Sequence, residues 1–264
     1  MPIDTVFDIK KGFHHLQNAY IQKKAVAPLS EMSPSLSIDD AYQVQLLHVE
    51  NELKQGKIIS GKKIGLTSKA MQTQLGVDEP DYGHLFHIMS VQNGATIKKG
   101  QVLQPKVEAE IAFKLAHDLK GPGVTTFDVI QATEYILPAL EIIDSRIKDW
   151  QITLADTIAD NASSGLYVLG NQPTNLAGID LRQVGVTLYQ NNEIANTGVG
   201  IAVLNHPAKC VAWLANKLAQ YNRSLKAGEI ILSGALSGAI AVQLGDSYTA
   251  KFSELGEVSI HFEN

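Results

Sequence analysis

The hydrophobic pattern divides the chain into a helical N-terminal section and a longer section of short strands. Residues 4–25 carry apolar positions at helical spacing. A second helix is predicted to begin after Ser37, because Ser37-x-x-Asp40 resembles a capping box with aspartate in the glutamate position. Gly56 follows its apolar face, where a helix commonly ends. We therefore expect residues 1–56 to form a helical section.

From residue 57 onward the pattern changes to short β-like runs separated by glycine and aspartate. Two helices are predicted among them, over residues 125–137, ended by Pro138, and over residues 207–221, beginning with Pro207. The strands do not alternate regularly with helices, which disfavours Rossmann and TIM-barrel architectures. We expect an α+β protein in which residues 57–264 form one mixed, mostly antiparallel β core. The predicted strands are 57–66, 106–115, 139–146, 165–170, 185–190, 229–234, 247–252 and 257–262.

Composition narrows the classes of partner. The chain has 264 residues, 45% hydrophobic and 19% charged, with a formal charge of −5. It carries no basic stripe with interleaved aromatic residues, so we do not expect a nucleic-acid partner. We expect the partner to be a small molecule. Its single cysteine, Cys210, excludes an intramolecular disulfide and a thiolate metal cluster, and its apolar neighbours predict a buried thiol.

The location of the protein is predicted from two missing signals. The N-terminal residues lack the continuous apolar stretch of a signal peptide. No run reaches the ~18 apolar residues of a membrane span. We therefore expect a cytoplasmic protein that does not enter a membrane.

The segment Lys106-Val-Glu108-Ala-Glu110 carries the strongest chemical signal. On a strand, Glu108 and Glu110 point to the same face, about 7 Å apart along the chain. Two adjacent carboxylates repel each other, and a hard divalent cation such as Mg²⁺ or Mn²⁺ would relieve that repulsion. Alternatively, both glutamates are solvated residues of an edge strand.

Glu141 is a second carboxylate in an unexpected place, because apolar residues surround it in the segment 138–146. Together with Glu108 and Glu110 it would make a set of three oxygen ligands, which leaves room for a 2-oxo acid and water. The pattern alone supports the metal site and the solvated edge strand about equally.

Two lysines and three polar segments complete the candidate chemistry. Lys62 and Lys63 are adjacent on a predicted strand and face opposite sides, so we expect one to face inward, where it is suited to proton transfer, although the sequence does not choose between them. The alternative, which is the more common case, is a surface lysine pair. The segments 80–84 and 160–165 are rich in turn-forming residues, and Ser233-Gly234 follows a strand; each is suited to ligand contact or is an ordinary turn or bend. The histidines show no metal-type spacing.

Several familiar catalytic motifs are missing. The chain has no G-x-S-x-G nucleophile elbow, no P-loop and no complete G-x-G-x-x-G motif. Acyl-serine chemistry and nucleotide cofactors are therefore poorly supported.

Seven segments taken in order resemble one family. They are GKKIGLTSKAMQ, EPDYGHL, PKVEAEIAF, PALEIIDSRIKDW, DTIADNASSG, LNHPAKCVAWLANKL and AGEIILSG. The family is that of the 2-oxopent-4-enoate (2-hydroxypenta-2,4-dienoate) hydratases and 2-oxo-3-hexenedioate decarboxylases of aromatic meta-cleavage catabolism, within the fumarylacetoacetate-hydrolase-like superfamily. The resemblance runs from about residue 37 to the C-terminus.

This resemblance implies a β-roll core that encloses one Mg²⁺ or Mn²⁺ ion, in a homo-oligomer that can have a pathway enzyme as partner. It implies Lys63 and Asp81 as catalytic residues. Ala235 departs from the family pattern, in which a second serine is common, so a hydroxyl contact to the substrate is in doubt there. The resemblance implies metal ligands at Glu108, Glu110 and Glu141, and substrate contacts at Leu66, Ser163, Ser164, Ser233 and Gly234.

The resemblance also leaves several activities open. We expect a hydratase that converts 2-hydroxypenta-2,4-dienoate into 4-hydroxy-2-oxopentanoate, because residues 143–170 look more like the pentenoate hydratases than the decarboxylases. The alternatives are 2-oxo-3-hexenedioate (4-oxalocrotonate) decarboxylase and 2-oxohept-4-ene-1,7-dioate hydratase. A fumarylacetoacetase-type hydrolase would need a histidine–acid pair that the sequence does not reveal, and a 2-oxo-acid binding protein without activity would have no use for an inward lysine.

Overall fold

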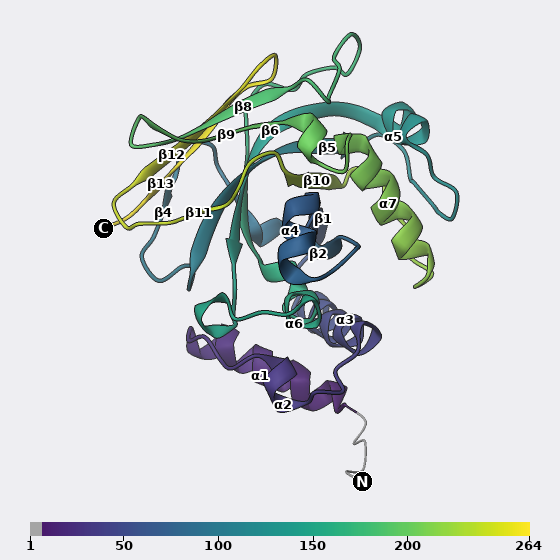
Figure 1. Cartoon of the computed structure of the whole chain (residues 1–264), viewed down its shortest axis with the longest axis vertical. Helices are drawn as coiled ribbons and strands as arrows, with labels where there is room; N and C mark the ends of the chain where they lie inside the picture. The colour runs from purple at the N-terminus through teal and green to yellow at the C-terminus, as the bar shows by residue number, and fades with distance from the viewer. Residues whose placement is uncertain (1–6) are drawn as a thin grey trace.

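The computed structural model describes residues 7–264, apart from the side chains of residues 74 and 75. Within that range, N-terminal helices lie at one end of two strongly curved β-sheets (Figure 1). The expected α+β class, with a helical N-terminal section and a mixed, mostly antiparallel core, is confirmed. Among the described residues, no helix is long and apolar enough to cross a membrane.

The N-terminal helices α1 (Ile9–Gln22), α2 (Leu29–Met32) and α3 (Ile38–Lys54) pack with α6 (Leu154–Ala159). The predicted capping box is confirmed, since the Ser37 side chain accepts from the Asp40 N–H while Asp40 accepts from the Ser37 N–H. The part of the first predicted helix before residue 7 lies outside the described residues.

The larger sheet contains eight strands in the described part of the chain, ordered β2-β1-β10-β5-β6-β7-β3, with β11 beside β5. Strands β5 and β6 form its long antiparallel centre, and β1 pairs parallel with β10. The bounds are β1 Ile59–Gly65, β2 Asp81–Phe86, β3 Ser90–Val91, β5 Pro105–Leu115, β6 Thr133–Asp144, β7 Ser164–Leu169, β10 Ile230–Ala235 and β11 Ile240–Ala241.

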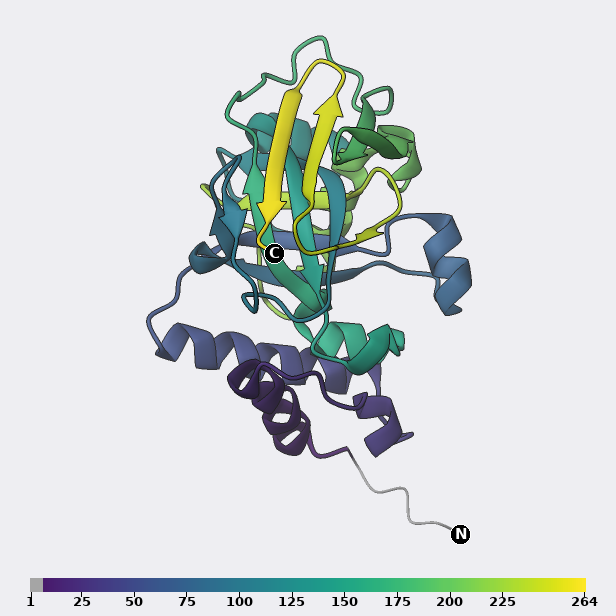
Figure 2. The same cartoon turned by 90° about the vertical axis from the view of Figure 1, so that its left-hand side faces the viewer.

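The smaller sheet, β4-β13-β12-β8-β9, lies against the larger one, with the β12–β13 hairpin in front of it in Figure 2. Helix α7 (Pro207–Ala219) flanks the larger sheet beside α5 (Thr126–Ala132), and α4 (Lys69–Leu75) projects from the body. Cys210 is buried in α7, as predicted. The strands are β4 Thr96–Ile97, β8 Gly185–Gln190, β9 Glu193–Val199, β12 Ser247–Phe252 and β13 Gly256–Phe262.

Two local predictions were wrong. The helix expected over residues 125–137 ends at Ala132, and residues 133–144 continue as strand β6 through Pro138. Long-range pairing with β5 overrides the helical spacing there, because Thr133, Tyr135 and Ile136 suit a pleated sheet. The segment 80–84, expected as a turn, instead enters β2, whose six residues are all buried in antiparallel pairing with β1.

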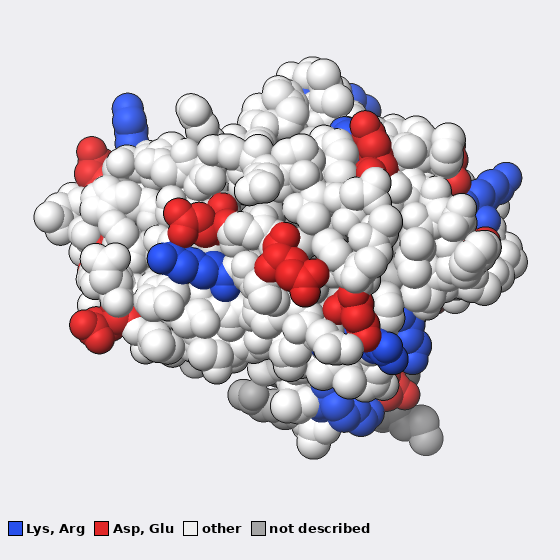
Figure 3. Space-filling view, turned by 90° about the horizontal axis from the view of Figure 1, so that it is seen from above, with Lys and Arg blue, Asp and Glu red and all other residues white. Residues whose placement is uncertain are grey.

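The surface seen from above carries both signs of charge. On that face, lysine and arginine side chains are interspersed with aspartate and glutamate (Figure 3).

Candidate metal and acid–base site

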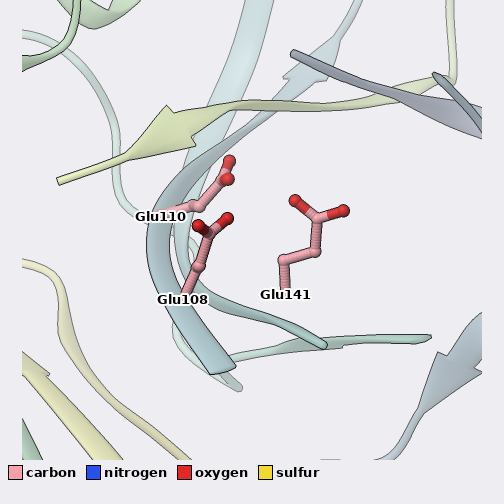
Figure 4. A group of neighbouring side chains, drawn as sticks. All are labelled: Glu108, Glu110 and Glu141. Carbon is pink, nitrogen blue, oxygen red and sulfur yellow. The ribbon is translucent and has the colours of Figure 1, made fainter. Parts of the chain in front are cut away.

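The register of β5 against β6 brings the three predicted carboxylates together. Glu108 lies directly opposite Glu141 across the two strands, and Glu110 is two residues further along β5, on the same face. Carboxylate oxygens of the three residues all lie within 4.8 Å of one another. Figure 4 shows the side chains converging from the two strands. The solvated edge strand is excluded, because β5 pairs on both sides.

Glu110 and Glu141 are buried without enough hydrogen-bond partners, and Glu108 is half-buried beside them. Glu110 and Glu141 are 1% and 0% exposed, and Glu110 Oε1 and both Glu141 oxygens accept no hydrogen bond from the described residues. Burial, opposed by Lys63 and reinforced by Glu141, raises the pKa of Glu108 to about 7. Burial and the two neighbouring carboxylates raise the pKa of Glu110 well above its ordinary value. Buried carboxylate oxygens that lack hydrogen-bond donors in this way fit a Mg²⁺- or Mn²⁺-type ion.

Lys63 is the cation nearest to this cluster. Its Nζ lies 3.2 Å from Glu141 Oε1 and donates to the Ala162 carbonyl at 3.0 Å. Burial by itself would lower the pKa of Lys63, but Glu141, Asp81 and the two β5 glutamates outweigh it and raise the pKa above its ordinary value. The amine is therefore held as an ammonium beside the carboxylates.

Asp81 begins β2 and faces the same hollow as Lys63. Its Oδ2 accepts from Thr157 Oγ1 at 3.2 Å, whereas Oδ1 has no hydrogen-bond partner among the described residues. Burial raises the pKa of Asp81, although Lys63 opposes the shift. A side chain at Gly65 would place its Cβ 2.2 Å from Asp81 Oδ1, so only glycine leaves room for this carboxyl group.

Both adjacent lysines are buried, on opposite faces of β1. The sequence suggested only one inward lysine, yet Lys62 is 4% exposed and Lys63 is 3% exposed. Lys62 Nζ donates to both oxygens of Glu229, at 2.7 and 2.8 Å. Lys62 therefore forms an ion pair with Glu229 on the face away from the carboxylate cluster, and Lys63 faces the cluster.

A cavity of about 210 Å³ opens onto the cluster. Of the predicted residues, Lys63, Leu66, Asp81, Glu108 and Ser163 line it. An adjoining hollow of about 240 Å³ shares Gly65, Leu66, Met71, Glu108 and Ala239 with it. The candidate site is thus an extended cavity that reaches the cluster at Glu108, whereas Glu110 and Glu141 do not line either hollow.

Three predicted substrate contacts lie outside this cavity lining. Ser164 Oγ donates to the Asn161 carbonyl at 2.7 Å, and Ser164 lines a different hollow. Ser233 Oγ donates to the Ile111 carbonyl at 2.9 Å. The Gly234 N–H donates to Glu110 Oε2 at 2.7 Å, so this glycine orients a carboxylate of the cluster.

Sequence reasoning assigned no role to several residues that line the two hollows. Among them, Lys106, Trp150 and Thr157 line the cavity at the cluster, and Ser237, whose Oγ has no hydrogen-bond partner among the described residues, lines the adjoining hollow. Lys106, Trp150 and Thr157 lie within segments that resemble the family, but those segments alone did not indicate that the three side chains meet at one cavity. A further signal was the position of Lys106 two residues before Glu108, which places both on one face of the strand.

The chain resembles proteins of one family over nearly its full length. Residues 63–262 match the model of the fumarylacetoacetate (FAA) hydrolase C-terminal family. The chain is 45% identical over 249 residues to a 2-keto-4-pentenoate hydratase of Paraburkholderia xenovorans (strain LB400), covering 94% of this chain and 93% of the relative. It is 43% identical over 249 residues to a 2-hydroxyhexa-2,4-dienoate hydratase of Comamonas testosteroni, covering 94% of each.

A solved structure extends the similarity to three dimensions. The 4-oxalocrotonate decarboxylase from Pseudomonas putida G7, complexed with magnesium and adipate, superimposes with a TM-score of 0.94 at 35% identity. The match covers 98% of this chain and 100% of the decarboxylase. That relative holds a divalent metal in the same fold.

Proposed function

The chain belongs to the fumarylacetoacetate hydrolase family, and from this premise we propose that it is a hydro-lyase of the 2-keto-4-pentenoate hydratase group. It adds water to 2-hydroxypenta-2,4-dienoate and forms 4-hydroxy-2-oxopentanoate in aromatic meta-cleavage catabolism. The observation that carries the proposal is the buried Lys63 ammonium, 3.2 Å from one of three clustered glutamates. That arrangement suits proton transfer to a substrate whose negative charge develops beside it.

The cofactor in this proposal is one Mg²⁺ or Mn²⁺ ion held by Glu108, Glu110 and Glu141. Their unpartnered oxygens support this assignment, and the magnesium in the similar decarboxylase agrees with it. When bound, such an ion supplies a Lewis acid for the 1-carboxylate and 2-oxygen of a 2-oxo acid.

The reaction requires protons to move between positions of the substrate. The substrate 2-hydroxyl loses a proton, C3 and C5 each gain one, and C4 gains a hydroxyl group, so one water is consumed. Lys63 is the buried group with a proton to give, and Asp81, with one free oxygen and a raised pKa, is placed to exchange a proton nearby. Leu66 and Ser163 line the pocket and contact the substrate in this proposal.

Decarboxylation of 4-oxalocrotonate is the second candidate, because that enzyme shares the fold at a TM-score of 0.94. Stabilised negative charge next to a metal-bound carboxylate serves loss of CO₂ as well as hydration. The hydratase is preferred because the hydratase relatives reach 45% identity, against 35% for the decarboxylase. We further propose a homo-oligomer in the cytoplasm, as the resemblance implies.

A substrate assay tests the proposal. The protein is incubated with 2-hydroxypenta-2,4-dienoate and Mg²⁺ or Mn²⁺, while the dienoate absorbance and the product are followed. Metal-dependent formation of 4-hydroxy-2-oxopentanoate, lost with EDTA and with Lys63→Met, is the expected result. CO₂ release from 2-oxo-3-hexenedioate with no hydration would replace the hydratase by the decarboxylase.

A further inference from the structure

Two side chains missed by the sequence stand between the site cavity and a second hollow. Lys106 on β5 and Trp150 line the cavity of about 210 Å³ at the carboxylate cluster. The same two side chains also line a neighbouring cavity of about 470 Å³, which extends toward Lys98 and Lys99. Lys106 Nζ lies 4.1 Å from the centre of the Trp150 ring, a cation–π contact that holds the pair together.

The backbone that carries Trp150 is strained and firmly held. Asp149 and Trp150 have φ values of 54° and 56°, a left-handed conformation that aspartate tolerates but that is unusual for a bulky residue such as tryptophan. Gln104 secures the turn: its Nε2 donates to the carbonyls of Ser145 and Ile147 at 3.0 and 2.8 Å, and its Oε1 accepts from the Asp149 N–H at 2.8 Å. Trp150 Nε1 donates to the Gln104 carbonyl at 3.0 Å, which fixes the ring.

A conformation secured by this many contacts is typical of a functional position. The turn is close to the surface, where an unstrained loop would satisfy the same backbone groups. The strained turn holds the bulky Trp150 indole in a fixed orientation at the boundary of the two cavities. Ile152, which also lines the site cavity, is two residues further along the chain and donates its N–H to the Trp150 carbonyl at 2.9 Å.

We propose that the Lys106–Trp150 pair is the end wall of the substrate pocket and sets the longest 2-oxo acid that the site accepts. The pair limits the cavity at the cluster to a short acid and separates it from about 470 Å³ of further space. Without the indole the two hollows join, and a longer carbon chain fits. This inference specifies the substrate class of the proposed function and rests on it.

The test measures binding of saturated, straight-chain 2-oxo acids, from 2-oxopentanoate to 2-oxooctanoate, by calorimetry in the presence of Mg²⁺. Wild type should bind the shortest acid and lose affinity as the chain lengthens. Trp150→Ala should bind 2-oxooctanoate at least about ten-fold more tightly than wild type does, since each misfit methylene costs about that factor. Its affinity for 2-oxopentanoate should change much less than its affinity for 2-oxooctanoate.

Three further variants make the result specific. Trp150→Phe keeps an aromatic ring beside Lys106 and should retain the length limit. Lys148→Ala changes an exposed residue of the same turn that lines neither cavity and should match wild type. Lys106→Ala opens the same wall from β5, so it should relax the limit even where Trp150→Ala fails to fold.

The outcomes separate this inference from the proposed function. The proposal that this pair limits substrate length would be overturned by either of two results. One is that wild type binds acids of all chain lengths equally well, and the other is that Trp150→Ala and Lys106→Ala both keep the wild-type length limit. Turnover of 2-hydroxypenta-2,4-dienoate by wild type is measured in parallel. If the variants shift the length limit but wild type does not turn over this dienoate, the end-wall proposal is supported and the proposed hydratase activity is rejected.

Discussion

Replacing Glu110 with glutamine should stabilise the metal-free protein and abolish its stabilisation by Mg²⁺. Glu110 suits this test because one oxygen, Oε1, has no partner among the described residues and the other accepts from the Gly234 N–H at 2.7 Å. The glutamine carbonyl can keep the Gly234 hydrogen bond. The glutamine amide can donate to a neighbouring carboxylate, so the substitution removes charge at constant shape.

The magnitude follows from the spacing of the carboxylates. Two unit charges at the limiting separation of 4.8 Å repel by about 3.5 kcal/mol at an effective dielectric constant of about 20. Glu110 has two such neighbours, but the Lys63 ammonium and proton uptake by the cluster relieve part of the repulsion. We therefore expect a gain of about 2–3 kcal/mol in the free energy of unfolding, equivalent to roughly 5 °C or more in Tm.

The assay is thermal and urea unfolding in EDTA and again with saturating Mg²⁺. Wild type should gain about 2.7 kcal/mol at a hundred-fold excess of metal over Kd, and Glu110→Gln should gain nothing. Glu193→Gln, at an exposed position, is the matched control and should behave as wild type in both conditions. A less stable Glu110→Gln protein in EDTA would refute the argument from repulsion, and an undiminished Mg²⁺ response would remove Glu110 from the ligand set.

Three other predictions concern the lysines and a buried histidine. Glu229→Ala leaves the buried Lys62 ammonium without its partner and should lower the free energy of unfolding by about 3 kcal/mol or more. The double variant Lys62→Met with Glu229→Leu should recover most of that loss. Equal losses in the two proteins, measured by urea unfolding, would contradict this prediction. Lys63→Met should lower kcat at least about 10²-fold while calorimetry shows Mg²⁺ binding as tight as in wild type or tighter; unchanged turnover would exclude proton transfer by Lys63. Burial, reinforced by Arg146, lowers the pKa of His48 to about 3, so the unfolded chain takes up a proton below about pH 6.5 that the folded chain refuses. The free energy of unfolding should therefore fall by about 1.4 kcal/mol per pH unit from pH 6.5 toward pH 3, and His48→Phe should remove that contribution. Urea unfolding at pH 7 and pH 5 measures it, and an equal loss of stability in wild type and in His48→Phe would refute the prediction.

Much of the candidate site could be predicted because it follows local rules. Alternation along a strand places Glu108 and Glu110 on one face, and the structure agrees. The capping box at Ser37 depends on residues three apart and is present. The similarity to one family was also readable from several ordered motifs. Local periodicity and short-range hydrogen bonds are encoded within a few residues, so the sequence alone determined these features.

Other features depend on partners distant in the chain. The pairing of Glu108 with Glu141 is a matter of register between β5 and β6, which the alternation of neither strand specifies. The burial of Lys62 became intelligible only with Glu229, which lies 167 residues away. The strand at residues 81–86 and the end of α5 at Ala132 were likewise decided by sheet pairing that local propensity did not anticipate.

The end wall of the pocket belongs wholly to the tertiary structure. Trp150 reaches the site through a left-handed turn that Gln104 secures, and Lys106 meets it from β5. No residue type or spacing announces such a contact, because its free energy comes from groups that folding brings together. The sequence by itself supplied the carboxylates and the lysine that we propose to bind a metal and move protons. The tertiary structure decided how close they come and where the cavity beside them ends, because both depend on contacts between distant strands.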